Sequence, residues 1–388
     1  MRGLIGSTAE GEPVKGSWTD GALSFVPKLS LILIATLLMS PVSFIAAELP
    51  VCKVGCNYSS IASAVEVADS GDIISIKKGT YRENLVIDRD LTLVGSAKGQ
   101  VVINPGSEGR PIITVQGPGV EVTVRSLTVS NAAGEAGDTA ENMLPNGITV
   151  RSGAGLKLLN VIIYGNEKCG LHLLGDSSAV VVSSSLAQNG NAGCIDDGCR
   201  LIVEDTRISG NGLVLTETAT ATITNSTISN HDDIGLTLRD TSSVEITSSR
   251  VGTSKTGLLL EDNSFISLFD STVRDAGDGL RLTDNARANV SGSELTDCTS
   301  GLELRNNTKA SMSDSKVVSN DHGVSLFDAA QLWIADCRIA YNDIGVRCNP
   351  GSTAAIDGCD IRFYKNFDAN TDGLGAEVVE RLQDRCRN

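Results

Sequence analysis

Apolar and polar residues alternate along most of this chain, and from Gly235 to Gly345 the alternation repeats every 22 residues. Each repeat starts with a glycine followed by an apolar, a variable and a second apolar residue. Alternation with a period of two is typical of β-strands, and a repeat of roughly 20–50 residues is typical of a solenoid. The six repeats begin with GLTL at 235, GLLL at 257, GLRL at 279, GLEL at 301, GVSL at 323 and GVRC at 345.

Two further apolar columns recur at the same step, one from Ile246 to Ile356 and one from Val251 to Ile361. Three short strands per coil, separated by turns, account for these columns, because successive side chains of a strand point to opposite faces. The sequence therefore predicts an all-β solenoid whose core grows coil by coil. A column of small residues runs between the two apolar columns: Ser249, Ser271, Ser293, Ser315, Cys337 and Cys359.

The coils before this region are less regular. Gly147, Gly170 and Gly212 continue the glycine column, but Gly193 fits poorly, since the steps on either side of it are 23 and 19 residues. Asparagine and aspartate gather before many of the glycines, as at Asn166. These residues tolerate left-handed turns and bond to the local backbone, so we interpret them as structural.

Both ends of such a stack need a cap, because exposed strand edges invite aggregation. Residues 58–69 are amphipathic, and Ser59 or Ser60 can cap the start of a helix there, which predicts an N-terminal capping helix. Residues 376–387 predict a C-terminal capping helix. We therefore divide the chain into a leader (1–47), an N-terminal cap with the first coils (48–110), β-helix repeats (111–366) and a C-terminal cap (367–388).

Residues 28–47 combine a basic flank, the apolar run LSLILIATLLM and a small-residue end. This pattern is typical of a cleaved secretory signal; a retained membrane anchor is the alternative. We expect an exported protein, periplasmic, at the cell surface or extracellular, with no membrane span after signal cleavage.

Export gives the ten cysteines a possible bonding role. Cys52 and Cys56 flank a short turn and are the best candidates for a disulfide. Cys337 and Cys359 are 22 residues apart and should stack on adjacent coils, as a disulfide or as two buried thiols. No cysteine spacing matches a zinc site, and the chain has only three histidines.

Residues 61–96 (IASAVEVADSGDIISIKKGTYRENLVIDRDLTLVGS) resemble the opening of pectin-lyase-like right-handed β-helix proteins. They are similar to the start of pectin methylesterases and of the nitrous-oxide-accessory periplasmic β-helix proteins. The coils from 120 to 366 look like the parallel β-helix repeats of the same superfamily. The resemblance implies a single-stranded right-handed parallel β-helix, for which we expect about 10–11 coils.

That superfamily includes lyases, hydrolases, esterases, epimerases and non-enzymes, so the resemblance is weak for activity. The catalytic signatures do not carry over. NTDG at 370–373, DD at 196–197 and 232–233, and DHG at 321–323 resemble polygalacturonase motifs but occur in the wrong order. The resemblance therefore transfers no catalytic residue.

The formal net charge of −15 argues against a nucleic-acid partner, which would favour a basic surface. The glycine-led strands should form one long sheet whose outward positions lie two and four residues after each glycine. This sheet carries no tyrosine or tryptophan on which a sugar could stack.

One charged patch is expected on this sheet. Arginine forks suit the carboxylates of an anionic polymer, and a lyase can use an arginine as base. We predict catalytic roles for Arg281 and Glu303, and substrate-binding roles for Arg239, Glu261 and Arg305. Cross-strand ion pairing on a solvated face is the alternative, because opposite signs alternate along the columns.

A second patch should lie where an insertion, residues 132–145, emerges beside the sheet. Arg151, His172 and the pair Asp196 and Asp197 are placed next to it. Loops over a rigid sheet often carry function. We predict a catalytic role for His172 and a substrate-binding role for Arg151; the alternative is that His172 is an exposed bystander.

Asp240, Asp262 and Asp284 should stack in one turn column about 4.8 Å apart. Carboxylates this close repel one another unless a cation lies among them, and oxygen ligands suit Ca²⁺. The ladder therefore raises Ca²⁺ as a candidate ligand. The alternative is that aspartate favours the turn and the charges splay into water.

Our leading hypothesis is an exported protein that binds or processes an acidic polysaccharide or cell-surface glycan. If it is an enzyme, we expect a polysaccharide lyase or glycoside hydrolase acting on a uronate-containing glycan. The alternative is a non-catalytic surface or periplasmic scaffold or adhesion protein with a protein or glycan partner. We expect a monomer.

Overall fold

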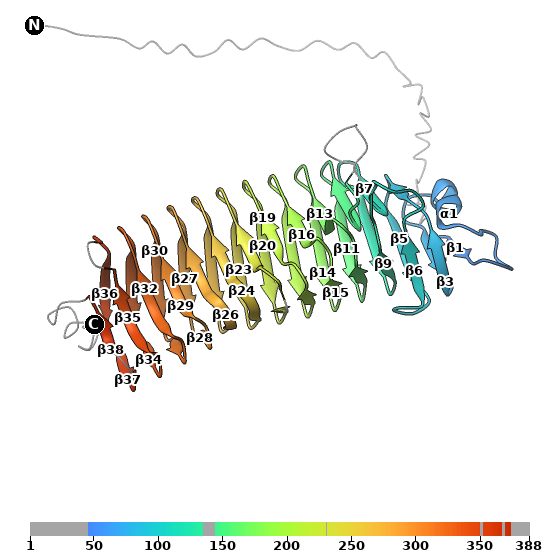
Figure 1. Cartoon of the computed structure of the whole chain (residues 1–388). Helices are drawn as coiled ribbons and strands as arrows, with labels where there is room; N and C mark the ends of the chain where they lie inside the picture. Colours follow the sequence, from blue (N-terminus) through green and yellow to red (C-terminus); the bar gives the residue numbers. More distant parts are fainter. Residues whose placement is uncertain (1–45, 135–143, 230, 350–351, 367–368, 374–388) are drawn as a thin grey trace, which may run out of the picture. The chain divides into compact units, whose positions relative to one another are not determined.

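The computed structural model describes residues 46–134, 144–229, 231–349, 352–366 and 369–373 of the 388-residue chain. These residues form a right-handed parallel β-helix of about 14 coils, nearly all of it strand (Figure 1). The all-β parallel fold is confirmed. More coils are present than the about 10–11 expected, because the coils before Gly147 lack the glycine marker by which coils are counted in a solenoid sequence.

The first sheet, here called sheet A, contains 14 strands in the order in which they occur along the chain, each paired in parallel with the next. The strands of sheet A are β1 (Glu48–Val51), β2 (Ile73–Ile76), β5 (Leu91–Gly95), β8 (Glu121–Arg125), β11 (Gly155–Leu159), β14 (Ser178–Val182), β17 (Arg200–Glu204), β20 (Thr220–Thr224), β23 (Ser243–Thr247), β25 (Phe265–Phe269), β27 (Arg287–Ser291), β30 (Lys309–Ser313), β33 (Gln331–Ala335) and β36 (Ala355–Cys359).

Two further ladders complete each coil, and the long strands β24 (Arg250–Leu260) and β26 (Thr272–Leu282) belong to both. Sheet B, the glycine-led ladder, also contains β4 (Leu85–Ile87), β7 (Ile113–Gln116), β10 (Ile148–Arg151), β13 (Cys169–Leu173), β16 (Asn191–Ile195), β19 (Leu213–Leu215), β22 (Ile234–Leu238), β29 (Ser300–Leu304), β32 (His322–Leu326), β35 (Ile344–Cys348) and β38 (Ala369–Asp372). Sheet C also contains β3 (Gly79–Arg82), β6 (Val101–Asn104), β9 (Thr128–Ser130), β12 (Ile162–Tyr164), β15 (Ser185–Ala187), β18 (Arg207–Ser209), β21 (Thr227–Ser229), β28 (Glu294–Thr296), β31 (Lys316–Val318), β34 (Arg338–Ala340) and β37 (Arg362–Tyr364).

The glycine column exists because the coils touch there. A Cβ atom placed on Gly257 or Gly279 would lie 2.7 Å from the carbonyl oxygen of the glycine one coil further on. The coil that contains Gly193, whose spacing is irregular, also places a small residue at this contact. Leu171 pairs with Gly193, so Ala192 and not Gly193 occupies the glycine column there.

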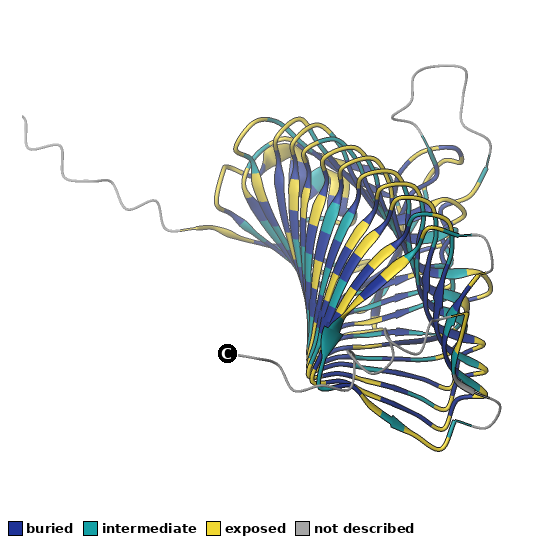
Figure 2. Cartoon of the chain, turned by 90° about the vertical axis from the view of Figure 1, so that its left-hand side faces the viewer, coloured by how far each residue is buried: buried dark blue, intermediate teal, exposed yellow. Residues whose placement is uncertain are grey.

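The core consists of the inward apolar columns of all three sheets. Figure 2 shows buried residues alternating with exposed ones along the strands. The column from Leu238 to Leu326 is fully buried at every step. Each such side chain stabilises the fold by about 1.5–3 kcal/mol relative to leaving it in water.

The N-terminal cap is the helix α1 (Ile61–Val67), as predicted. Ser60 is its N-cap residue and accepts a hydrogen bond from the backbone N–H of Ser63. The carboxylate of Glu83 accepts two more bonds, from the N–H groups of Ile61 and Ala62. Ile61, Ala64 and Val65 turn inward and cover the open end of the core.

At the other end, β38 pairs with β35, so the coils continue to Asp372 and beyond the expected limit of 366. The predicted C-terminal capping helix lies outside the described residues. So does most of the insertion at 132–145. The segment at 1–45, which contains nearly all of the expected signal, is likewise not described. In the part of the chain that is described, no helix has the length and apolar character needed to cross a membrane.

Polar ladders join the coils where backbone amides would otherwise be unsatisfied. Each serine in the small-residue column accepts a bond from the N–H of the serine one coil earlier, at 3.1 Å between Ser249 and Ser271. Asparagines do the same at a neighbouring turn. Asn342 Oδ1 accepts bonds from both the backbone N–H and the amide of Asn320. The structural interpretation of these residues is confirmed.

Two disulfides join described residues. Cys52–Cys56 is present, as predicted. Cys169–Cys194 joins β13 to β16 and was not predicted. Cys337 is a free, buried thiol, so the stacked pair with Cys359 is not bridged. Burial raises the pKa of Cys337 to about 11, which keeps this thiol protonated.

Candidate functional site

The predicted site residues of sheet B lie in two separate places. His172 on β13 pairs with Thr149 on one side and Cys194 on the other. Arg281 and Glu303 pair with each other on β26 and β29. Five strand steps of about 4.8 Å, roughly 24 Å in total, separate His172 from Arg281. The three predicted catalytic residues therefore do not form one site.

The charged patch is internally paired. Arg239 Nε donates to Glu261 Oε2 at 2.7 Å. Glu303 is buried, and its Oε1 accepts from Arg305 Nε at 2.6 Å and lies 3.3 Å from Arg281 Nε. These contacts are those that the ion-pair interpretation predicts. The catalytic and substrate-binding roles of these five residues remain predictions.

The aspartate ladder stacks as expected, with each residue in the left-handed conformation. Asp262 Oδ2 accepts from the backbone N–H of Asp240 at 3.0 Å, and Asp284 Oδ2 accepts from that of Asp262 at 3.3 Å. One oxygen of each carboxylate therefore already satisfies a turn amide. No group of three or more acidic, histidine or cysteine side chains in the described ranges converges as metal ligands do. Calcium at this ladder remains a prediction.

His172 is not an exposed bystander. It is 7% exposed, and its Nε2 lies 2.8 Å from Asp196 Oδ2. Asp196 Oδ1 accepts a second bond, from the hydroxyl of Thr216 at 2.7 Å. On its other side, His172 Nδ1 lies 3.1 Å from the amide nitrogen of Asn146.

The orientation of Asn146 decides where His172 carries its proton. Asn146 Oδ1 accepts from the backbone N–H of Cys169 at 3.0 Å, so its NH₂ group must face the imidazole. His172 Nδ1 is then an acceptor, and the proton lies on Nε2, where it is donated to Asp196. Protonating Nδ1 would bring two donors together. Asn146 therefore favours the tautomer of His172 that carries its proton on Nε2.

Two carboxyl groups in this region have pKa values that shift in opposite directions. Burial raises the pKa of Asp196, but the hydrogen bonds from His172 and Thr216 outweigh it, so this pKa lies below its ordinary value. The charge of Asp197, its hydrogen bond and the other nearby acids raise the pKa of Glu217. Asp196 is thus held ionised while Glu217 retains its proton more readily.

These groups line a cavity of about 550 Å³ at the turn that leads from sheet B to sheet A. A neighbouring hollow of about 390 Å³ shares Arg151 and Ser152 with it and continues to Gln116. The two form a groove along the solenoid axis, here called the Asp196 groove. The larger cavity of this groove is lined by Arg151, Ser152, Leu174, Gly175, Asp196, Asp197, Thr216 and Glu217.

Arg151 is the cation of the Asp196 groove. It donates to Gln116 Oε1 from Nε at 3.0 Å and from Nη2 at 2.6 Å. It takes part in no salt bridge with a described residue, unlike Arg239, Arg281 and Arg305. Its charge is therefore available to an anionic ligand.

The sequence analysis placed Asp196 beside the second patch without giving it a role, and it did not single out Glu217. The shortened coil hid the outward position of Asp196 on sheet B, because counting from Gly193 instead of Ala192 puts it one position out of register. With the true register, Asp196 falls in the second outward column, between Leu174 and Thr216. Glu217 occupies the turn position that aspartate holds in the following coils.

Replacing Asn146 by Asp is expected to change the protonation of His172. A carboxylate oxygen would then face Nδ1, accept its proton and stabilise the imidazolium. Imidazole ¹⁵N chemical shifts, measured by NMR at neutral pH, should show the proton on Nε2 alone in the wild type and a proton on Nδ1 in the variant. Asn342→Asp is the matched control, since that amide contacts no histidine among its bonded partners. A wild-type protein with its proton on Nδ1 would contradict the assignment.

Comparisons with solved structures agree with the fold. Tailspike protein 3 of bacteriophage CBA120 superposes with a TM-score of 0.56 at 15% identity, over 79% of this chain and 55% of the tailspike. A periplasmic alginate epimerase, AlgG, gives 0.54 at 11% identity, over 77% of each chain. The catalytic unit of a GH87 α-1,3-glucanase from Streptomyces thermodiastaticus gives 0.56 at 14% identity, over 81% and 65%. This chain thus spans only about half of the tailspike, and these identities support the fold alone.

A comparison with curated proteins gives no significant match. The family model described as "Right handed beta helix region" matches residues 146–279 and 253–369. The two matches overlap and together span 146–369, which is 224 of the 388 residues. The repeats, the register of the three sheets and this match agree, and the chain belongs to the right-handed β-helix family.

Proposed function

We propose that this protein is an exported enzyme that binds an acidic polysaccharide along the Asp196 groove and hydrolyses it there. The observation that carries the proposal is the pair of carboxyl groups in one cavity whose pKa values shift apart. Glycoside hydrolysis requires one carboxyl group that gives a proton and one that is ionised.

Glu217 is the proton donor in this proposal. It protonates the glycosidic oxygen as the bond from that oxygen to the anomeric carbon breaks. Asp196 takes a proton from the attacking water, whose oxygen bonds to the anomeric carbon. His172 and Thr216 hold the Asp196 carboxylate in place by their two hydrogen bonds. They also keep it ionised while the substrate binds.

Arg151 supplies the preference for an acidic chain. Its guanidinium can receive a uronate carboxylate in a two-pronged contact. The acids at the other end of the groove would repel a uronate, which favours placing the charged sugar at Arg151 and the reacting bond beside Glu217. The named substrates of two of the similar structures, alginate and α-1,3-glucan, are likewise glycans.

Export is supported by the signal-like segment at 28–47 and by the two disulfides between described residues. Disulfides persist in oxidising compartments outside the cytosol. The periplasmic place named for the alginate epimerase is compatible with this view.

A polymer-length assay tests the proposal. Purified protein is incubated with polygalacturonate, alginate, a glycosaminoglycan and neutral glycans, with and without Ca²⁺, and chain length is followed by size-exclusion chromatography. We expect an acidic polymer to shorten, with new reducing ends and no new ultraviolet absorbance from elimination. New absorbance would indicate a lyase instead. The same column reports whether the protein itself is the expected monomer.

Unchanged length across the whole panel, with retention of one glycan by the protein, would contradict the enzyme. That outcome would favour the alternative, a non-catalytic scaffold or adhesion protein.

A further inference from the structure

Sheet A presents a second surface whose composition differs from that of sheet B. Its outward positions form columns in register across the strands. One column carries Arg200, Thr220, Ser243, Phe265, Arg287 and Lys309 on six successive strands from β17 to β30. A neighbouring column carries Trp333 on β33, between Ser311 on β30 and Asp357 on β36.

Aromatic rings are exposed on this surface. Phe269 is 36% exposed and Phe265 on the same strand is partly exposed, while Trp333, three strands further along, is 48% exposed. Aromatic residues make up only 4% of the chain. Their neighbours on the surface are mainly serine, threonine and asparagine, so the rings pack against little apolar material. Rings held flat on a rigid sheet suit the apolar C–H face of a sugar ring.

The cations on this surface are also available. Arg200, Arg287 and Lys309 are exposed, and none of them takes part in a salt bridge with a described residue. Arg287 and Lys309 lie directly opposite each other on β27 and β30. Like charges in that position repel each other, which destabilises the unliganded surface. A bound anion would remove this repulsion. These exposed cations belong to a protein whose formal net charge is −15.

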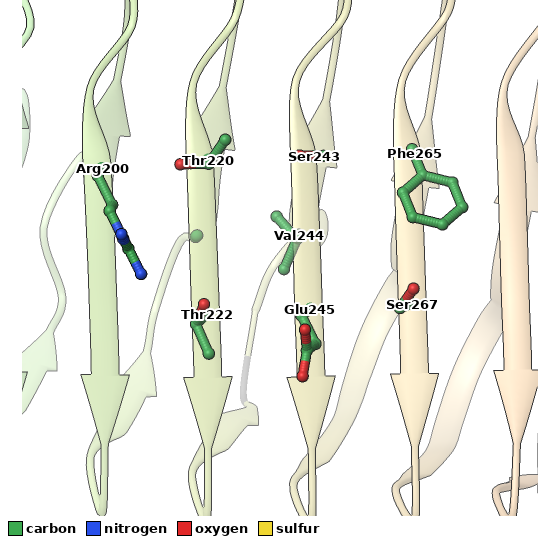
Figure 3. Close-up of a pocket in the computed structure, with 9 residues that line it drawn as sticks. Arg200, Thr220, Thr222, Ser243, Val244, Glu245, Phe265 and Ser267 are labelled. Atoms are coloured by element: carbon green, nitrogen blue, oxygen red, sulfur yellow. The ribbon is translucent and has the colours of Figure 1, made fainter.

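A hollow of about 270 Å³ lies between Arg200 and Phe265. Figure 3 shows the side chains of Arg200, Glu245 and Phe265 on the same face of neighbouring strands. The hydroxyls of Thr220, Thr222, Ser243 and Ser267 line the hollow between them. Hydroxyls and the Glu245 carboxylate give donors and acceptors that match the hydroxyls of a sugar.

The dimensions suit a polymer. Six strand steps of about 4.8 Å separate Arg200 from Trp333, so the surface extends for roughly 29 Å. The cations and aromatic rings are spread along the solenoid axis and do not form a compact pocket. A long, linear ligand would contact them all.

We propose that the outward face of sheet A, from β17 to β33, is a second glycan-binding surface that holds an anionic polysaccharide parallel to the solenoid axis. Phe265 and Trp333 stack on sugar rings, and Arg200, Arg287 and Lys309 receive carboxylate or sulfate groups. Binding here involves no bond cleavage and does not depend on the chemistry at the Asp196 groove.

Affinity electrophoresis of the full chain tests this, in native gels containing polygalacturonate, alginate or neutral dextran. We expect the acidic polymers to retard the wild type and added NaCl to weaken the retardation. The double variant Phe265→Ala/Trp333→Ala and the double variant Arg287→Ser/Lys309→Ser should each lose affinity by about tenfold or more. Because all four side chains are on the surface, circular dichroism should show a folded protein.

Tyr164→Ala and Arg338→Ser on sheet C are matched controls for an exposed ring and an exposed cation. Equal loss in the controls, or no loss in either double variant, would overturn the proposal. Retardation by dextran as strong as by the acidic polymers would also overturn it. Asp196→Asn separates the two proposals, because it should stop cleavage while the retardation persists.

Discussion

Replacing Asp196 by Asn is expected to lower the rate of polysaccharide cleavage by about 10²–10⁴-fold. The amide keeps the shape of the side chain but cannot take a proton from water, and a positioned general base contributes that much to the rate. Glu217→Gln should cause a loss of similar size by removing the proton donor. Reducing-end release from the polymer cleaved by the wild type measures both effects.

The pH dependence of the rate gives the same prediction a second test. Asp196 must be ionised, so activity is lost as pH falls through its lowered pKa. Glu217 must be protonated, so activity is lost as pH rises through its raised pKa. The wild-type profile should therefore be bell-shaped. The remaining activity of Glu217→Gln should lack the decline on the alkaline side.

Asp314→Asn is the matched control, since Asp314 is an exposed, left-handed turn residue on a distant coil. We expect its cleavage rate to equal that of the wild type. Full activity in both Asp196→Asn and Glu217→Gln would contradict the assignment of the reacting groups, whichever polymer is cleaved.

Replacing Gly279 by Ala is expected to destabilise the solenoid by about 1–3 kcal/mol, because the added methyl group overpacks a close backbone contact. Its Cβ would lie 2.7 Å from the carbonyl oxygen of Gly301 and 3.2 Å from Cys298 Sγ. A backbone carbonyl cannot move without shifting the next coil. The midpoint of urea unfolding measures the effect.

Gly193→Ala is the control for this prediction. The new Cβ would lie 2.8 Å from Leu213 Cδ2, a methyl group that can rotate away. We therefore expect a smaller loss of stability there. Equal losses at both positions would contradict the inference that the close contact between coils explains the glycine column.

The local pattern identified most of the scaffold. The step of 22 residues, the alternation within strands and the cap at Ser60 depend on contacts between a residue and its copy one coil away, and such contacts leave a mark in the sequence. The serine and asparagine columns were visible for the same reason. A solenoid makes these inferences possible because each coil contacts only its neighbours.

The candidate site was less visible. His172 and Arg151 were selected from the sequence, but Arg281 lies roughly 24 Å from His172, about five strand steps along the axis, and Glu303 lies one step further. Asp196 was placed beside these two residues but given no role, and Glu217 and the Cys169–Cys194 disulfide were not predicted. All three features lie in or beside the coil whose step is shortened, where counting from the glycine loses the register.

The amino-acid pattern alone was enough to predict a parallel β-solenoid with a capped N-terminal end, since a repeat is recognised from its period. The number of coils and the bond between His172 and Asp196 became known only from the three-dimensional arrangement of the coils. That arrangement alone revealed the opposite pKa shifts of Asp196 and Glu217, and the unpaired cations and exposed rings of sheet A. These features depend on which side chains contact one another across irregular coils and on how deeply each is buried. The period of the repeat gives no information about either.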